Sequence, residues 1–198
     1  MKTSLFLTLF TVFSVLVAAQ KMKFESGDLK FLKGQTELKV EFDYGKMTFY
    51  NEKMSEEAYI EKRMKEIEAD KGKEEAEKWL ADWEKSKITD FVDKFIASFN
   101  KNCDLHASKD ADAKYTVIVE TTWIYPGWFA GVMKQPAKVS TVLKFVETVN
   151  PGNVLAVINS QNAPGDNFVG VANNNDRIAE GYAKTGKSLA GLVKKGMK

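Results

Sequence analysis

The chain has 198 residues, with 29 basic and 27 acidic side chains and a net charge of +2. Hydrophobic residues make up 44% of it and aromatic residues 12%, which excludes disorder, collagen-like repeats and a disulfide scaffold as descriptions of the whole chain. A charge this close to balance predicts no nucleic-acid binding, and one histidine and one cysteine leave little material for a metal site or a nucleophilic triad.

The first 19 residues have the pattern of a signal peptide. Lys2 supplies a basic start, residues 5–17 are apolar, and Val17 and Ala19 are the small residues of a cleavage site before Gln20. The apolar stretch is shorter than the roughly 20 residues that cross a bilayer, and an uncleaved anchor is the alternative. The sequence therefore predicts an exported protein without a transmembrane span. Its mature part, residues 20–198, is expected to be one domain that stays in the periplasm or is secreted.

The mature part begins with a predicted extended region at residues 29–44. Leu38, Val40 and Phe42 alternate there with charged residues, as in a strand with one buried face, and Gly34 marks a turn before them.

A charged helical segment is predicted over about residues 51–99. Ser55 is a suitable N-cap, and Gly72 ends the first helix or joins it to the next. Residues 73–99 form one helix or two, the second capped by Thr89. The apolar stripe after Thr89 is wide and aromatic, so that part should contact the core, whereas the charged part before it is expected to be a solvated face.

The remainder predicts a β-meander over about residues 114–160, followed by a helix over about 175–196. The first strand places Val117, Val119, Thr121 and Trp123 on one side, and a Pro-Gly turn at residues 150–153 precedes the third strand. Residues 160–176 are rich in Asn, Gly and Asp and are predicted to form a long loop. The expected fold class is α+β, or mixed α/β: a two-layer sandwich of an antiparallel-rich sheet with helices packed on one face.

A nucleotide-binding pattern, G-x-x-x-x-G-K-[ST], occurs through Gly181, Gly186, Lys187 and Ser188. A working P-loop follows a buried strand, but asparagines and a helix start precede Gly181, and apolar residues keep helical spacing through the motif. We interpret the match as false and expect a helix whose glycines allow close packing. No nucleotide or other cofactor is predicted.

Other polar groupings also point away from catalysis or metal binding. Cys103 and His106 lie in a polar stretch with no evident third group to orient the imidazole, and two ligands are too few for zinc. Cys103 is expected to be a small buried side chain, with an intermolecular disulfide or a reactive thiol as the alternatives. Oxygen ligands at residues 166–176 do not have the spacing of an EF-hand, and helix capping explains Asp176 better. No catalytic or metal residues are predicted.

Four aromatic residues are the candidate binding residues: Trp123, Tyr125, Trp128 and Phe129, around a Pro-Gly pair between two strands. Aromatic side chains in a loop stack on sugars, grip peptides or contact a membrane surface. The alternative is that they fold back and cap one end of the core. An exposed sheet edge offers a second mode of binding, by pairing with a strand of a partner.

Several short motifs carry a resemblance to a group of small, uncharacterised exported bacterial proteins of the Bacteroidetes type. They are Phe-Leu-Lys-Gly at residues 31–34, Phe-Asp-Tyr at 42–44, the pair Trp79 and Trp83, Pro-Ala at 136–137, and the helix at 177–184. The element order from Phe91 onward also resembles envelope domains such as the Tol-system N-terminal domain and the curli-secretion domain, as an analogy of fold. The resemblance implies an exported protein and transfers no activity.

The sequence therefore favours an exported, non-enzymatic domain that binds a protein or a cell-envelope component through residues 123–129 and a sheet edge. The alternative is a small-ligand-binding protein or hydrolase with a pocket near the 160–176 loop, using residues such as Asp166, His106 or Tyr182. A structural role in an envelope assembly is a third hypothesis. The sequence leaves the oligomeric state open.

Overall fold

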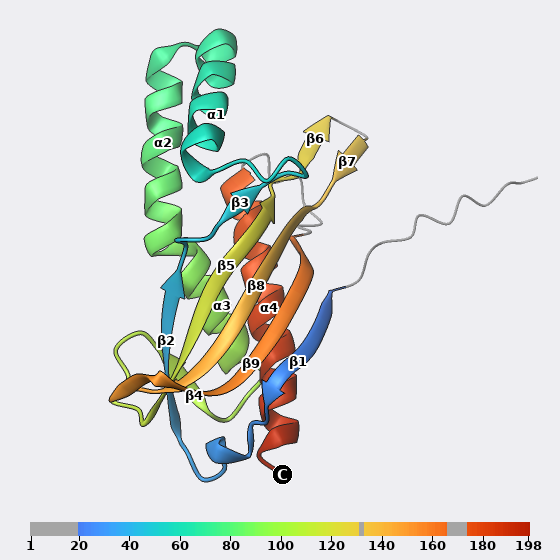
Figure 1. The fold of residues 1–198 in the computed structure, drawn as a ribbon. Helices are drawn as coiled ribbons and strands as arrows, with labels where there is room; N and C mark the ends of the chain where they lie inside the picture. Colours follow the sequence, from blue (N-terminus) through green and yellow to red (C-terminus); the bar gives the residue numbers. More distant parts are fainter. Residues whose placement is uncertain (1–19, 131–132, 166–173) are drawn as a thin grey trace, which may run out of the picture.

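One mixed sheet forms the first layer of the fold (Figure 1). The computed structural model describes residues 20–130, 133–165 and 174–198. The strand order is β1-β9-β8-β5-β2-β4, and β3 pairs with β5 beyond the end of β2. The strands are β1 (Lys21–Gly27), β2 (Glu37–Asp43), β3 (Thr48–Phe49), β4 (His106–Ser108), β5 (Tyr115–Tyr125), β8 (Ala137–Glu147) and β9 (Asn150–Gly165).

The longest ladders of this sheet are antiparallel, between β5 and β8 and between β8 and β9. This confirms the predicted meander. A separate antiparallel hairpin of β6 (Trp128–Ala130) and β7 (Met133–Gln135) extends from the end of β5 and β8.

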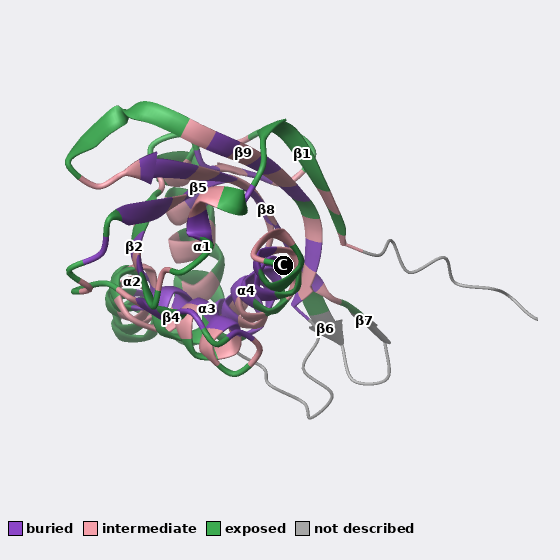
Figure 2. Cartoon of the chain, turned by 90° about the horizontal axis from the view of Figure 1, so that it is seen from below, coloured by how far each residue is buried: buried purple, intermediate pink, exposed green. Residues whose placement is uncertain are grey.

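Helices form the second layer, on one face of the sheet (Figure 2). They are α1 (Glu56–Lys71), α2 (Lys73–Ile88), α3 (Asp90–Asn100) and α4 (Asn174–Gly196), with a short 3-10 turn η1 (Lys30–Leu32). The α+β class and the two-layer arrangement agree with the sequence-based expectation. No helix in the described ranges has an apolar stretch long enough to cross a bilayer.

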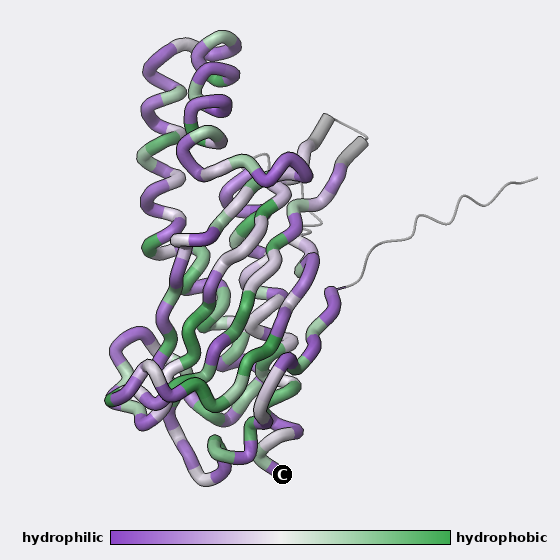
Figure 3. The backbone as a smooth tube through the Cα atoms, viewed as in Figure 1, coloured by the Kyte–Doolittle hydropathy of each residue, from purple (hydrophilic) through white to green (hydrophobic). Residues whose placement is uncertain are grey.

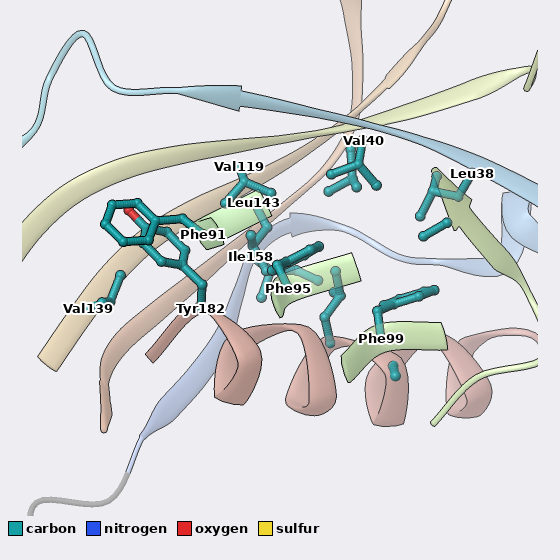
Figure 4. Close-up of a cluster of buried hydrophobic side chains, with 14 of the residues drawn as sticks. Leu38, Val40, Phe91, Phe95, Phe99, Val119, Val139, Leu143, Ile158 and Tyr182 are labelled. Carbon is teal, nitrogen blue, oxygen red and sulfur yellow. The ribbon is translucent and has the colours of Figure 1, made fainter. Parts of the chain in front are cut away.

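The core lies between α3, α4 and the sheet (Figure 4). Phe91, Phe95 and Phe99 of α3 are fully buried, as expected for the wide apolar stripe after Thr89. Tyr182 of α4 stacks on Phe91 with the ring centroids 5.0 Å apart, so the two helices share one aromatic layer beneath the strands.

The helices α1 and α2 form a hairpin that extends past the end of the sheet (Figure 1). Its base is anchored by aromatic packing: Tyr59 stacks on Phe49 at 4.0 Å between ring centroids, and Trp83 packs against both. The outer turns are mainly hydrophilic (Figure 3), and Tyr59 is the one fully buried residue of α1. The prediction of a solvated charged face is therefore confirmed.

The helix boundaries settle the question about residues 73–99. These residues form two helices, α2 and α3, which meet at Thr89. The expected Thr89 cap is wrong, because its side chain makes no capping hydrogen bond to α3 and its hydroxyl donates to the Lys85 carbonyl of α2 at 2.8 Å. Ser55 caps α1 as expected, because its side chain accepts a hydrogen bond from the backbone N–H of Ala58 at 3.3 Å. Gly72 separates α1 from α2 with φ of 91°, a conformation that favours glycine.

Three strand predictions need correction. Strand β1 was not expected, because its Lys and Glu residues alternate with few apolar ones, and residues 30–32 form a 3-10 turn rather than an extended segment. The hairpin between β8 and β9 reverses at residues 148–149, so residues 150–153, the expected turn, lie within β9, where the register is irregular. Residues 160–165 of the predicted loop also belong to β9, and residues 166–173 of that loop lie outside the described residues.

The face assigned to Trp123 was also wrong. The register between β5 and β8 shifts between Thr121 and Trp123, so the strand gains one residue there. Ile124 is consequently fully buried on the helix side, and Trp123 lies on the face that no helix covers. Simple alternation along the strand does not foresee this, because one inserted residue exchanges the two faces.

The P-loop-like motif is helical throughout, as predicted, because residues 181–188 lie within α4. A Cβ at Gly181 would lie 2.6 Å from Cγ2 of Val139 in β8, and one at Gly186 would lie 2.3 Å from the backbone oxygen of Phe95 in α3. The glycines therefore serve close packing against the sheet and against α3.

Candidate functional site

Two β-bulges meet at Ser140 of β8, on the face of the sheet that the helices leave uncovered. On one side, Thr122 is the extra residue of β5; on the other, Gln161 and Asn162 of β9 together oppose Ser140. Hydrogen bonds hold both bulges: Thr122 Oγ1 donates to the Ser140 carbonyl at 3.1 Å, and the Asn162 backbone N–H donates to Ser140 Oγ at 3.1 Å. Asn162 has φ of 55°, which asparagine tolerates better than most residues.

The bulges form part of a hollow of 440 Å³, which we call the double-bulge pocket. Its described lining is mainly uncharged and polar, with one aromatic ring and one cation. The lining residues are Asn51, Lys53, Thr122, Trp123, Ser140, Val142, Asn159, Gln161 and Asn162.

The aromatic ring of this pocket, Trp123, is held from several sides. Its indole N–H donates to the backbone carbonyl of Tyr50 at 2.6 Å, and its ring stacks on Tyr125 with the centroids 6.3 Å apart. The ammonium of Lys53 lies 5.5 Å from the ring centroid, within cation–π range. The position of the ring is therefore fixed before any ligand arrives.

A second hollow, of 340 Å³, lies beyond the Trp123–Tyr125 stack and is called here the aromatic–arginine pocket. Its described lining residues are Tyr50, Arg63, Tyr125, Gly127, Trp128, Asn174 and Arg177. The side-chain oxygen of Gln135 accepts two hydrogen bonds here, from the Tyr125 hydroxyl at 2.6 Å and from the Trp128 indole N–H at 3.0 Å. One amide thus positions two of the predicted binding residues.

The two arginines that line this pocket are the two arginines of the whole sequence. Arg63 of α1 pairs with Glu66 at 2.6 Å and lies 5.9 Å from the ring centroid of Trp79. Arg177 of α4 is mostly buried and donates to Asn174 Oδ1. Burial lowers the pKa of the Arg177 guanidinium, and the positive charge of Arg63 adds to that effect.

The structure brings together most of the predicted binding residues. Trp123 lines the double-bulge pocket, and Tyr125 and Trp128 line the aromatic–arginine pocket. Phe129 lies on β6, but its side chain is outside the described residues. The expectation named residues 123–129 as an aromatic loop and also placed Trp123 on the first strand of the meander; in the structure Trp123 and Tyr125 belong to β5, and Trp128 and Phe129 belong to β6.

Sequence reasoning missed both arginines and the amide side chains. The amides come from the 50–53 turn and from β9, which the sequence does not show to be neighbours of β5. The arginines did carry a signal, because a chain with 29 basic residues contains arginine at only two positions. Arginine differs from lysine because its guanidinium presents a planar set of hydrogen-bond donors. Two arginines in a lysine-rich chain are therefore positions to consider as binding residues.

The residues named for the alternative ligand-binding or hydrolase function do not converge. Tyr182 is fully buried, and its hydroxyl is hydrogen bonded to Thr121 at 2.8 Å; burial raises the pKa of this phenol. His106 is exposed on β4 at one edge of the sheet, and Asp166 lies outside the described residues. Cys103 is buried and free, as expected for a small core side chain. The described residues contain no cluster of three or more His, Cys, Asp or Glu suited to a metal ion.

Comparison with known proteins shows no family for this chain. No family model matches it, and no curated protein matches its sequence. Among solved structures it is similar to the PelC dodecamer from Paraburkholderia phytofirmans, at 12% identity and a TM-score of 0.42, covering 86% of this chain and 96% of that one. A single-substitution variant of that protein gives 10% identity and a TM-score of 0.39 over the same shares of the two chains. Likeness at this level carries no conclusion about function.

Proposed function

We propose that this chain is an exported, non-enzymatic domain that binds a protein or another component of the cell envelope. The binding surface is its aromatic end, defined here as Tyr50, Trp123, Tyr125 and Trp128. The export part of the proposal rests on the signal-peptide pattern of residues 1–19. The binding part rests on the geometry of the aromatic end.

The observation that carries the proposal is the exposed, fixed indole of Trp128. Its side chain is 43% exposed, and its polar atom is already hydrogen bonded to Gln135. Gln135 also holds the Tyr125 hydroxyl, and Tyr50 meets the Tyr125 ring edge-on at 5.9 Å between centroids. Aromatic side chains that are held in place before binding lose little conformational entropy when a partner covers them.

The alternative, that these aromatic residues cap the core, does not account for Trp128. Core-capping residues are buried by their own chain, as Phe49, Tyr59 and Trp83 are at the base of the α1–α2 hairpin. Trp128 instead lies on the short β6–β7 hairpin, away from that cluster.

The free edge of β1 is proposed as a second contact surface. Strand β1 pairs with β9 on one side, and no described strand pairs with its other side. Such an edge presents backbone N–H and C=O groups that a strand of a partner protein recognises.

The test is crosslinking of a tagged copy in its native cells, followed by purification from the envelope fraction and identification of what is captured. We expect a reproducible partner that is lost in Trp128→Ala. The matched control is Ile88→Ala, which removes another exposed apolar side chain, from the end of α2. Unchanged capture by a folded Trp128→Ala variant would remove the aromatic end from the proposal.

Export is tested separately by the intact mass of the protein recovered from the envelope fraction. Cleavage before Gln20 predicts a chain of residues 20–198. A full-length chain found with the cytoplasm contradicts the exported location and leaves the binding experiment to stand alone.

A further inference from the structure

We infer that the double-bulge pocket binds an uncharged sugar ring of a glycan. The inference goes beyond the proposed function, because it assigns a ligand class to a hollow other than the one that Trp128 lines. It is carried by the backbone geometry of the pocket, by the polar groups that line it, and by the fixed aromatic ring at its side.

The backbone geometry is the first argument. Bulges re-aim side chains and are concentrated next to functional sites. Here the two bulges lie on β5 and β9, the strands on either side of β8, and both lie opposite Ser140, so Thr122, Trp123 and Gln161 all line one hollow. A fold that needed only a flat sheet would not need to interrupt two ladders at the same residue, or to hold Asn162 at φ of 55°.

The lining chemistry is the second argument. A side-chain amide both donates and accepts hydrogen bonds, as a sugar hydroxyl does. Within the described residues, the amides of Asn159 and Gln161 have no hydrogen bond to another side chain or to the backbone. These two amides lie on the same face of β9, two positions apart, and are available to hydroxyl groups of a ligand.

The described lining of the double-bulge pocket holds one charged group and no guanidinium, in contrast to the other hollow. Lys53 is the one charged residue in the described lining, and it lies over the ring of Trp123. The guanidinium groups, which suit carboxylates and phosphates, line the other hollow instead. An acidic ligand would therefore be expected in the aromatic–arginine pocket rather than here.

The aromatic ring completes the site. Sugar rings have apolar faces of C–H groups that pack on aromatic rings, and the Trp123 indole is fixed by Tyr50 and Tyr125. The hollow measures 440 Å³, within the usual size of a small-ligand site.

The experiment is saturation-transfer NMR on the purified protein with three neutral tetrasaccharides: cellotetraose, maltotetraose and tetra-N-acetylchitotetraose. We expect transfer to at least one of them, and weaker binding by about fivefold to tenfold in Gln161→Ala and in Asn159→Ala, since each loses one hydrogen bond. Asn153→Ala is the matched control, because it removes an exposed amide from the same strand outside the pocket. Glucuronate is the charged probe, and preferential binding of glucuronate at this pocket contradicts the inference.

The outcomes separate this inference from the proposed function. Saturation transfer that is weaker in Gln161→Ala and unchanged in Trp128→Ala supports binding at the double-bulge pocket, because Trp128 lines the other hollow. The absence of saturation transfer to all three tetrasaccharides overturns the inference. Binding that is unchanged in both Gln161→Ala and Asn159→Ala overturns it as well. A partner that is captured in cells and lost in Trp128→Ala upholds the proposed function in either case.

Discussion

The absence of a side chain at Gly186 lets α4 approach α3. A Cβ there would lie 2.3 Å from the backbone oxygen of Phe95, which cannot move aside as a flexible side-chain end would. Gly191 lies five residues further along α4, and a Cβ there would meet nothing within 4 Å. The same helix therefore contains one glycine that packing requires and one that it does not.

We expect Gly186→Ala to lower the free energy of unfolding by about 1–3 kcal/mol, because it overpacks the contact between α3 and α4. Gly191→Ala should raise it by up to about 1 kcal/mol, since alanine is the better helix former at an open position. Urea titration of both variants measures the difference. A loss of stability in Gly191→Ala equal to that in Gly186→Ala would contradict the packing explanation.

For single residues, the sequence predicted correctly that the P-loop-like motif is a helix, and it predicted the wrong face of the sheet for Trp123. The helical spacing of Ile178, Tyr182 and Leu189 showed that the glycine-rich motif is a helix, because local periodicity is enough to show that. The face of Trp123 depends on an extra residue in β5, and only pairing with β8 reveals it. A bulge is a property of two strands, so the sequence of one strand does not contain it.

Among the elements, β5 and β8 are joined by an ion pair as well as by their ladder. The carboxylate of Glu120 on β5 accepts hydrogen bonds from the ammonium groups of Lys144 on β8, at 2.8 Å, and of Lys46, at 3.2 Å. Burial on its own raises the pKa of Glu120, but the hydrogen bonds and positive charges of Lys144 and Lys46 outweigh it, and the net shift is downward from 4.5.

This shift predicts a dependence of stability on acid. A carboxyl group with a lower pKa in the folded state stabilises the fold above its unfolded pKa, near 4.5, and this contribution is lost as the pH falls through the folded pKa. Glu120→Gln should therefore lose less stability than the natural chain between pH 5 and pH 3, in urea titrations at several pH values. Lys144→Gln keeps the carboxyl group but removes one cause of the shift, so the stability that this variant loses on acidification should be smaller than in the natural chain and complete at a higher pH. Identical pH profiles for the natural chain and Glu120→Gln would show that Glu120 does not contribute.

The elements were predictable where their apolar residues are regular. Helix α1 follows from its cap, and helix α3 and the β5-β8-β9 meander follow from periodicity. Strand β1 could not be predicted in this way, because as an edge strand it buries few side chains and carries Lys21, Lys23 and Glu25. The prediction of a loop also failed for its first residues, 160–165: their Asn, Pro and Gly side chains favour turns, but pairing with β8 overrides that preference.

For the whole molecule, burial is unevenly distributed between the two helical parts. Helix α4 buries residues along its length, whereas α1 buries one. The α1–α2 hairpin is held at its base by the cluster of Phe49, Tyr59 and Trp83, and exposed ion pairs on its outer turns contribute little.

Hydrogen exchange followed by mass spectrometry should therefore find low protection in the outer turns of the hairpin, about residues 64–75, and high protection in α4, β5 and β8. The physical reason is that local opening of the outer turns exposes little apolar surface. Protection of the outer turns equal to that of α4 would contradict this and would indicate a partner or a second copy covering the hairpin.

The site was predictable only in part at this scale. The aromatic residues are close in sequence and could be named, but Arg63 and Arg177 come from α1 and α4, and the amides of Asn51 and Gln161 come from a turn and from β9. Their meeting depends on the order of strands in the sheet and on where the helices cross it. Neither is contained in local periodicity.

The pairing of β1 with β9 has a consequence for how the chain acquires its fold. Lys21 lies opposite Gln161, and the Gln20 side chain is hydrogen bonded to Ser160 and Ser188. The first strand thus finds its neighbours only after most of the polypeptide has been made. Long-range closure of this kind is slow, so the amino-terminal segment remains unpaired while synthesis continues. Strand β1 therefore cannot complete this edge of the sheet until residues 156–161 of β9 have been synthesised.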